Sequence, residues 1–279
     1  MIRGVDRTAI FLDDTDRARF VDRLRQLRPE EGARLFAWAL MPNHVHLVAQ
    51  SGPAGISRLM ARLGTTHAAA FNRRHGRVGH LFQDRFKSVP VESDSHLRWL
   101  VRYVHRNPIE AGRIASIGEL DRDPWTGHHE LVSEPPAPLV ATGHVLSWFA
   151  PGRAEAVRAL RAWMEDGGRS EAPPAEALAD PEVLQRFVGA AVARAAAARG
   201  VAPADVWRGS RRRAACEARA LAIWELYGRL GLPAARIERA LGLSAGAATR
   251  ALRRADRLVR DQNRPLRQGA GRWYQATSQ

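Results

Sequence analysis

The chain reads Met41-Pro42-Asn43-His44-Val45-His46-Leu47-Val48 where two histidines stand one residue apart in an apolar run. Such a run predicts a β-strand, and side chains on a strand alternate between its two faces. His44 and His46 therefore share one face, while Val45 and Leu47 occupy the other. Two imidazoles on one face can hold a divalent ion if another element supplies a third ligand. The alternative is a structural strand whose histidines make ordinary hydrogen bonds.

A second informative stretch, Ser95–Pro108, has the pattern of an amphipathic helix. A buried stripe is predicted by apolar residues at helical spacing, namely Leu97, Leu100, Val101 and Val104. Tyr103 and Asn107 are four residues apart, so both face the same neighbour. We expect Pro108 and Gly112 to end this helix, which leaves the pair in its last turns. The alternative is ordinary packing for the tyrosine and a helix-end signal for the asparagine.

The order of predicted elements indicates an α+β fold. After a short N-terminal strand, the pattern predicts a helix at 16–27, strands at 33–41 and 45–50, a helix at 56–75, a strand at 81–91 and the helix of Tyr103. This β-α-β-β-α-β order is the ferredoxin-like arrangement. We expect the histidine strand inside the sheet and the tyrosine helix across it.

The rest of the chain predicts further parts. We expect a catalytic domain at 1–130, a linker rich in proline and alanine at 131–204 with short helices at 157–164 and 181–199, a helical domain at 205–267, and a flexible tail at 268–279. The helical domain is predicted to hold helices at 218–230, 234–241 and 244–260. The spacing of its apolar residues around Gly242 is typical of a helix-turn-helix.

Positive charge is concentrated in two places. Residues 205–267 contain 15 arginines against 6 acidic residues, a balance of +9 within a chain of net charge +14. Phosphate binding is predicted for arginines of the last helix, Arg250, Arg253, Arg254 and Arg257. Alanine and glycine at 245–248 argue against base reading there. The second group of DNA-binding candidates is Arg58, Arg62, Arg73, Arg74, Arg85 and Lys87, with phenylalanines between them.

Composition restricts the class of protein. A strongly basic chain favours a polyanionic partner such as nucleic acid, although abundant arginine also follows from a GC-rich gene. Cys216 is the single cysteine, which excludes an intramolecular disulfide. No segment has the roughly 20 apolar residues of a membrane span, so we expect no membrane partner.

Five ordered blocks within 1–130 resemble the REP-associated tyrosine transposases, single-tyrosine members of the HUH superfamily. The blocks are Ile10–Asp14, Met41–His46, Phe71–His75, Gly79–Lys87 and Tyr103–Gly112. The resemblance implies a metal-dependent endonuclease that cuts single-stranded DNA near a hairpin. It implies Tyr103 as the nucleophile, a 5′-phosphotyrosine intermediate, and Asn107 as the third metal ligand beside His44 and His46. Mg²⁺ or Mn²⁺ is expected rather than Zn²⁺, because no thiolate takes part.

The resemblance also sets expectations for partners. The C-terminal region is similar to the helix-turn-helix domain of the replication initiator DnaA. Single-stranded or hairpin DNA is the expected partner, with duplex DNA at the C-terminal region, in a cytoplasmic, nucleoid-associated monomer or homodimer. Relatives carry an additional stretch before the segment matching 2–7, so we expect this chain to lack the start of its first strand. Two other interpretations are a DNA-binding regulator that does not cut and an RNA- or metal-binding ferredoxin-like module.

Overall fold

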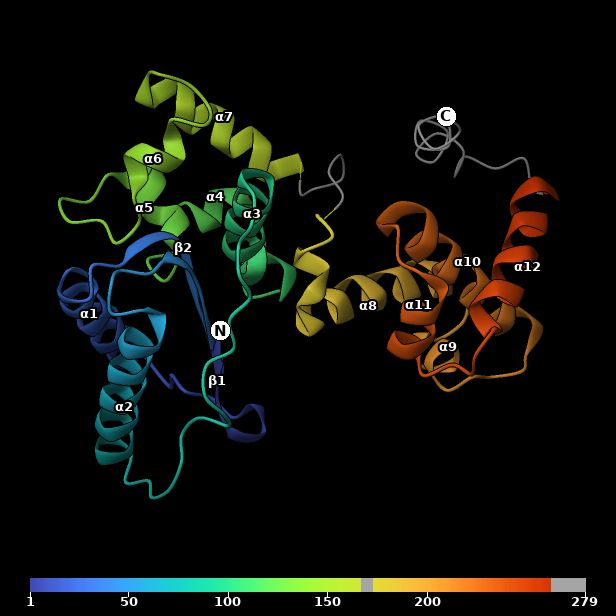
Figure 1. The fold of residues 1–279 in the computed structure, drawn as a ribbon, viewed down its shortest axis with the longest axis horizontal. Coiled ribbons are helices and arrows are strands. Elements are labelled where there is room, and N and C mark those ends of the chain that lie inside the picture. The colour runs from blue at the N-terminus through green and yellow to red at the C-terminus, as the bar shows by residue number, and fades with distance from the viewer. Residues whose placement is uncertain (167–172, 262–279) are drawn as a thin grey trace. The chain divides into compact units, whose positions relative to one another are not determined.

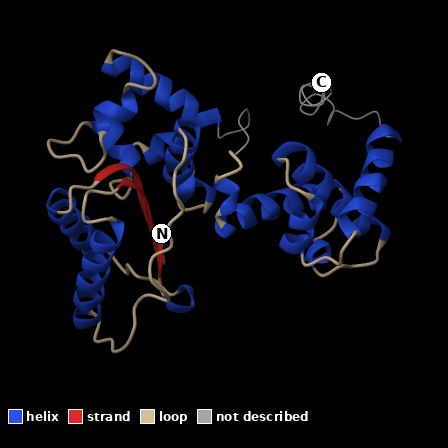
Figure 2. Cartoon of the chain, viewed as in Figure 1, coloured by secondary structure: helices blue, strands red, loops and turns tan. Residues whose placement is uncertain are grey.

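The computed structural model of the chain describes residues 1–166 and 173–261 and divides the chain into two compact units. Unit 1 is Met1–Glu171 and unit 2 is Ala172–Gln279. Helices dominate both units, and the sheet belongs to unit 1 (Figure 2). The fold is therefore of the α+β class, as the sequence predicts.

The sheet contains three strands among the described residues. They are β1 (Ile2–Arg3), β2 (Arg34–Met41) and β3 (His44–Gln50), in the order β1-β3-β2 with both pairs antiparallel. A two-residue turn, Pro42–Asn43, joins β2 to β3, so the strands predicted at 33–41 and 45–50 are confirmed and form a hairpin. Every residue of β2 after Arg34 is buried. A strand with one face in water would alternate, so both faces of β2 are covered.

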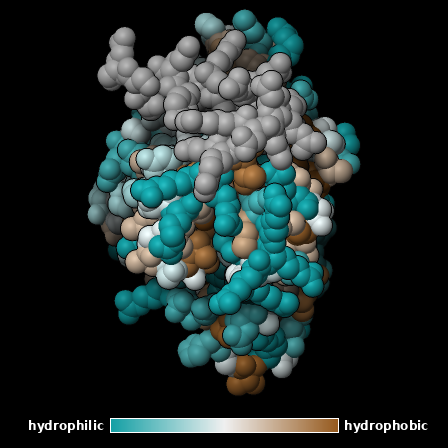
Figure 3. All heavy atoms as spheres, turned by 90° about the vertical axis from the view of Figure 1, so that its right-hand side faces the viewer, coloured by the Kyte–Doolittle hydropathy of each residue, from teal (hydrophilic) through white to brown (hydrophobic). Residues whose placement is uncertain are grey.

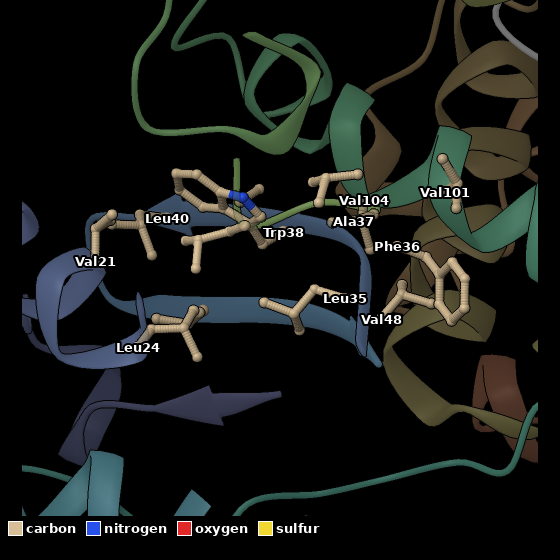
Figure 4. Close-up of a cluster of buried hydrophobic side chains, with 14 of the residues drawn as sticks. Val21, Leu24, Leu35, Phe36, Ala37, Trp38, Leu40, Val48, Val101 and Val104 are labelled. Atoms are coloured by element: carbon tan, nitrogen blue, oxygen red, sulfur yellow. The ribbon is translucent and has the colours of Figure 1, made fainter. Parts of the chain in front are cut away.

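Helices from distant parts of unit 1 cover the sheet. Figure 1 shows α1 (Asp14–Glu30) and α2 (Ile56–Arg74) on one side of it and α3 (Asp94–Glu110) on the other. Side chains of β2 lie between those of α1 and α3 in one core, as Figure 4 shows for Val21, Leu24, Leu35, Trp38, Val101 and Val104. The predicted placement of the Tyr103 helix against the sheet is confirmed, because α3 contacts both β2 and β3.

The segment that follows α3 belongs to unit 1. It contains α4 (Ile117–Leu120), α5 (Gly127–Ser133), α6 (Thr142–Leu146) and α7 (Arg153–Asp166), and the short 3-10 helix η1 (Val5–Arg7) lies near the N-terminus. Leu139, Leu160 and Met164 are fully buried in the core. The predicted linker at 131–204 differs from the structure over 131–166, because unit 1 extends beyond residue 130. The alanine and proline residues between these helices obscure the regular apolar spacing from which a folded segment would be predicted.

The predicted strand at 81–91 is wrong. No strand is present at these residues, and they are mostly exposed. The segment nevertheless lies along β1, where the amide of Gln83 donates to the carbonyl of Arg3 at 3.0 Å and the amide of Lys87 to that of Met1 at 2.9 Å. β1 has only two strand residues with which to form a ladder. Pro90 also lacks an amide hydrogen, so a continuous ladder cannot form.

The end of α3 also differs from the prediction. Pro108 lies inside the helix, which continues to Glu110 before Gly112 adopts a left-handed φ of 70°. Proline removes one helical hydrogen bond. Pro108 is nevertheless buried, and the helix continues for two more residues. Val101 and Val104 are buried as predicted, whereas Leu97 and Leu100 are only partly buried.

Unit 2 is a bundle of helices. It comprises η2 (Ala177–Ala179), α8 (Pro181–Ala197), α9 (Pro203–Trp207), α10 (Arg213–Leu230), α11 (Ala234–Leu241) and α12 (Ala247–Asp261). α10 packs against α8 and α12. The last helix begins at Ala247 rather than at the predicted Ser244, because Gly246 adopts a left-handed φ of 74°. The predicted tail at 268–279 lies outside the described residues.

Candidate active site

The two histidines of β3 lie next to each other on one face of the hairpin. Their ring centroids are 4.8 Å apart and the ring planes are nearly perpendicular, at 86°. Both side chains are half-buried, while Val45 between them is fully buried on the other face. β3 is the central strand, so hydrogen bonds to β1 and β2 hold its backbone at His44. This support fixes the spacing of the two imidazoles.

Tyr103 reaches this pair from α3. Its ring meets the ring of His46 edge to face, with centroids 6.0 Å apart and planes at 88°. The tyrosine ring also contacts Trp99, which lies one helical turn earlier in α3. The two rings are stacked, with centroids 5.0 Å apart and planes at 15°. Trp99 is itself 5% exposed, so it is a rigid support. The structure thus brings Tyr103 to the pair His44 and His46, from which it is far apart in the sequence.

Asn107 lies one helical turn beyond Tyr103 and is buried. Its side-chain nitrogen makes no hydrogen bond with any residue that the structure describes. A buried N–H donor without a partner costs free energy unless a ligand or water accepts from it. This group can therefore donate to an acceptor near the tyrosine, such as water or a phosphate oxygen, whereas a metal would be bound by Oδ1 of the same side chain.

The pattern of the sequence did not single out Asn43, which contacts His44 directly. Its Oδ1 lies 2.7 Å from Nδ1 of His44, and its Nδ2 donates to the carbonyl of Arg7 at 3.0 Å. The signal that could have indicated it is its place in the tight turn immediately before the first histidine. The partner in η1 could not be found from spacing alone.

The donor atoms at this site suit a divalent cation with open coordination positions. Within 1–166 and 173–261, no group of three or more histidine, cysteine, aspartate or glutamate side chains is placed to hold a metal. A metal at the histidine pair would therefore take two imidazoles and complete its shell with a carboxamide, water or phosphate oxygens. Such oxygen-rich completion fits Mg²⁺ or Mn²⁺.

Three of the predicted DNA-binding arginines form ion pairs with α1 and the residues at its ends. Arg58 and Arg62 contact the buried carboxylate of Glu31 at 3.3 and 2.6 Å. Arg74 contacts both Asp13 and Asp16 at 2.6 Å. These pairs join α2 to α1. Their charge is largely neutralised within the fold, so they are weaker candidates for phosphate than the sequence predicts.

The carboxylates at the start of α1 have unusual acidity. The hydrogen bond from Arg74 lowers the pKa of Asp13 from 3.8 to about 2. Burial raises the pKa of Asp16, but hydrogen bonds from the Leu12 amide, His75 and Arg74 outweigh it and leave that pKa below its ordinary value. Both groups therefore remain ionised at neutral pH and hold Arg74 in place.

The other candidate cations of unit 1 are exposed. Arg73 lies in the last turn of α2, and Arg85 and Lys87 lie on the segment beside β1. Phe71 is buried, whereas Phe82 and Phe86 are partly buried against the core. The rings therefore serve packing, and the cations are available to a polyanion.

Unit 2 presents its own arginines. Arg250, Arg253 and Arg254 are exposed on α12, whereas the side chain of Arg257 lies outside the described residues. Hydrophilic side chains predominate on the described surface seen in Figure 3. Glu238 of α11 is buried and accepts from the amide of Ala248 at 2.9 Å, which ties the start of α12 to α11.

Comparison with known proteins finds a family for part of the chain. Residues 1–107 match the model of the family described as IS200-like transposases. The matched range contains His44, His46, Tyr103 and Asn107, and it supports a DNA-processing transposase of this type. No curated protein and no solved structure matches the chain. Among the described helices, none is both long and apolar enough to cross a membrane.

Proposed function

We propose that the chain is a metal-dependent single-strand DNA endonuclease of the REP-associated tyrosine transposase type. The observation that carries this proposal is the edge-to-face contact of Tyr103 with His46, beside His44. A tyrosine in contact with one imidazole of a pair on a central strand is placed to attack a phosphate at a cation that the imidazoles would hold. The family match over 1–107 agrees with it.

The reaction is a transesterification. The phenolic oxygen of Tyr103 forms a bond to phosphorus and the bond from phosphorus to the 3′ oxygen breaks, which leaves a 5′-phosphotyrosine and a free 3′ hydroxyl. The phenol loses its proton and the 3′ oxygen gains one, so the step balances. A divalent cation supplies charge stabilisation at the non-bridging oxygens when bound. His44, His46 and Asn107 would hold that cation, and Trp99 orients the attacking ring.

The test of the nucleophile uses labelled single-stranded DNA from the flanks of the gene with Mg²⁺ or Mn²⁺. Wild-type protein is expected to give a protein–DNA adduct on a denaturing gel, and Tyr103→Phe to give none. Tyr227→Phe is the matched control, because Tyr227 is an exposed tyrosine of unit 2. An adduct that survives in Tyr103→Phe would show that another residue attacks.

The test of the metal ligands separates cleavage from binding. His44→Ala and His46→Ala are expected to lose metal-dependent cleavage while they retain most affinity for the same DNA. The reason is that the exposed cations Arg73, Arg85 and Lys87, which we propose contact the phosphates, are distinct from the imidazoles. Loss of folding in these variants would instead favour the structural interpretation of the histidine pair.

We interpret unit 1 as ferredoxin-like. The order β1-β3-β2, with 81–87 bonded along β1, corresponds to a four-stranded sheet whose last strand is irregular. The test is the set of contacts between backbone protons of neighbouring strands in NMR spectra, which report the strand order. A different strand order would contradict it.

We propose that unit 2 binds duplex DNA through phosphates, with α11 and α12 as a helix-turn-helix similar to that of DnaA. Support comes from the left-handed turn at Gly242 between the two helices and from exposed Arg250, Arg253 and Arg254. Small residues at the start of α12 leave little to read bases. Binding should therefore weaken steeply with salt and show little sequence preference.

The second candidate function is a DNA-binding regulator that does not cut. The ion pairs of Arg58, Arg62 and Arg74 are compatible with either function. Strong binding of flank DNA by wild-type protein, with no adduct in Mg²⁺ or Mn²⁺, would favour this regulator over the endonuclease.

A further inference from the structure

We propose that Asn43 is a positioning residue that fixes which ring nitrogen of His44 carries the hydrogen. Its side-chain amide bridges two groups, Nδ1 of His44 at 2.7 Å and the carbonyl of Arg7 at 3.0 Å. The inference rests on the proposed function, because it concerns how His44 is presented to a metal.

The chemistry of the amide gives the hydrogen bonds a single direction. A backbone carbonyl can only accept, so the side of Asn43 that faces Arg7 must be the NH₂ group. The oxygen then faces His44, and because this oxygen only accepts, Nδ1 of His44 must donate. In the neutral imidazole the hydrogen therefore lies on Nδ1, and the lone pair that a metal requires lies on Nε2.

The backbone around Arg7 is shaped to make this contact. Asp6 and Arg7 adopt left-handed φ angles of 48° and 59°, which residues other than glycine rarely adopt. Gly4 donates its amide to the carbonyl of Asn43 at 2.9 Å, and a side chain on Gly4 would meet the carbonyl oxygen of Thr8 at 2.3 Å. The segment between β1 and α1 thus forms hydrogen bonds with both the backbone carbonyl and the side-chain amide of Asn43. Asn43 has little freedom to rotate its amide.

The consequence concerns metal affinity. Histidine ligands nearly always donate their second ring hydrogen to a fixed acceptor, which sets the tautomer and the ring orientation. Loss of such an acceptor typically weakens metal binding by about 10- to 100-fold. Asn43 would fill this role for His44 without touching metal or substrate. The acceptor for His44 is the side-chain oxygen of Asn43, which belongs to the turn between β2 and β3 rather than to a strand.

The test reads the tautomer directly in the full chain without metal. Long-range proton–nitrogen correlation spectra of protein with ¹⁵N-labelled histidine, at about pH 8 where an ordinary imidazole is neutral, distinguish the two tautomers. His44 is expected to be protonated at Nδ1 in wild type and to populate both tautomers in Asn43→Ala. Asn43→Asp retains an acceptor and should retain the Nδ1 hydrogen. Asn72→Ala is the matched control, since Asn72 also donates to a backbone carbonyl, that of Gly79 at 2.8 Å.

A second measurement is Mn²⁺ affinity by electron paramagnetic resonance. Asn43→Ala should bind Mn²⁺ about tenfold or more weakly than wild type. An Nε2-protonated His44 in wild type, or the same tautomer in wild type and Asn43→Ala, overturns the role of Asn43. Failure of wild type to bind Mn²⁺ overturns the metal site of the proposed function instead, while the tautomer still decides the role of Asn43. If Asn43→Ala does not fold, wild type and Asn43→Asp suffice.

Discussion

Replacement of Asp16 by asparagine tests the link between α1 and α2. The Asp16 side chain is 2% exposed and accepts from the Leu12 amide at 2.9 Å, Arg74 at 2.6 Å and His75 at 2.9 Å. Hydrogen bonds to a charged group contribute about 1.5–3 kcal/mol each. Asparagine keeps one acceptor oxygen but turns an NH₂ group toward donors. Arg74 is 27% exposed and keeps its ion pair with Asp13, so we reduce the contribution of the Arg74–Asp16 hydrogen bond for solvent screening. We expect Asp16→Asn to lower the free energy of unfolding of unit 1 by about 2–4 kcal/mol.

The assay is urea unfolding followed by pulsed hydrogen exchange of peptides from β2, which report unit 1 alone. Asp14→Asn is the control, because Asp14 lies in the same helical turn, is 76% exposed and forms an ion pair with the neighbouring Arg17. Its expected cost is about 0.5 kcal/mol or less. The folded pKa of Asp16 is below 3.8, so its stabilisation is complete above that pH and is lost as pH falls through the folded value. Equal costs for both variants, or an Asp16→Asn penalty unchanged in acid, would refute the reasoning.

Three further changes probe other parts of the molecule. Gly127→Ala would place its methyl group within about 3.0 Å of three side chains. Unit 1 should therefore lose about 1–3 kcal/mol of stability in thermal melts. An unchanged melting temperature would contradict this close contact. Trp99→Leu should slow formation of the Tyr103 adduct about tenfold or more, because the ring loses its stacking support, and Trp99→Phe should restore much of the rate. Arg253→Ala with Arg254→Ala should reduce the salt slope of duplex binding by about 1.8, at 0.9 per phosphate, and an unchanged slope would exclude α12 as the contact.

Local patterns of the sequence predict the elements that carry the candidate site. Alternation in β3 places His44 and His46 on one face, and helical spacing places Tyr103 on the side of α3 that meets the sheet. These features depend on residues close together in the chain. The bridge from Asn43 to the carbonyl of Arg7 could not be predicted, because it depends on a backbone conformation in η1 that no side-chain pattern encodes.

Long-range contacts explain the failed predictions. The segment 81–91 contains apolar residues typical of a strand, but the neighbour that it needs, β1, is only two residues long. The burial of His105, which is 0% exposed in the core of unit 1, is also invisible in the sequence. Burial lowers the pKa of His105 far below its ordinary value, with a smaller contribution from His128, so this imidazole is neutral.

The backbone contacts along β2 give unit 1 a protected edge. The amide of Ala141 donates to Leu35 at 2.8 Å and the amide of Leu40 to the carbonyl of Trp125 at 3.0 Å, so the chain beyond the histidine and tyrosine motifs occupies the outer side of β2. An uncovered strand of this hydrophobicity is a template on which another copy can add its own strand. A fragment cut at residue 130 would keep every residue proposed for chemistry yet expose part of that template. The segment that carries the chemistry therefore ends earlier in the chain than the segment that completes the fold of unit 1.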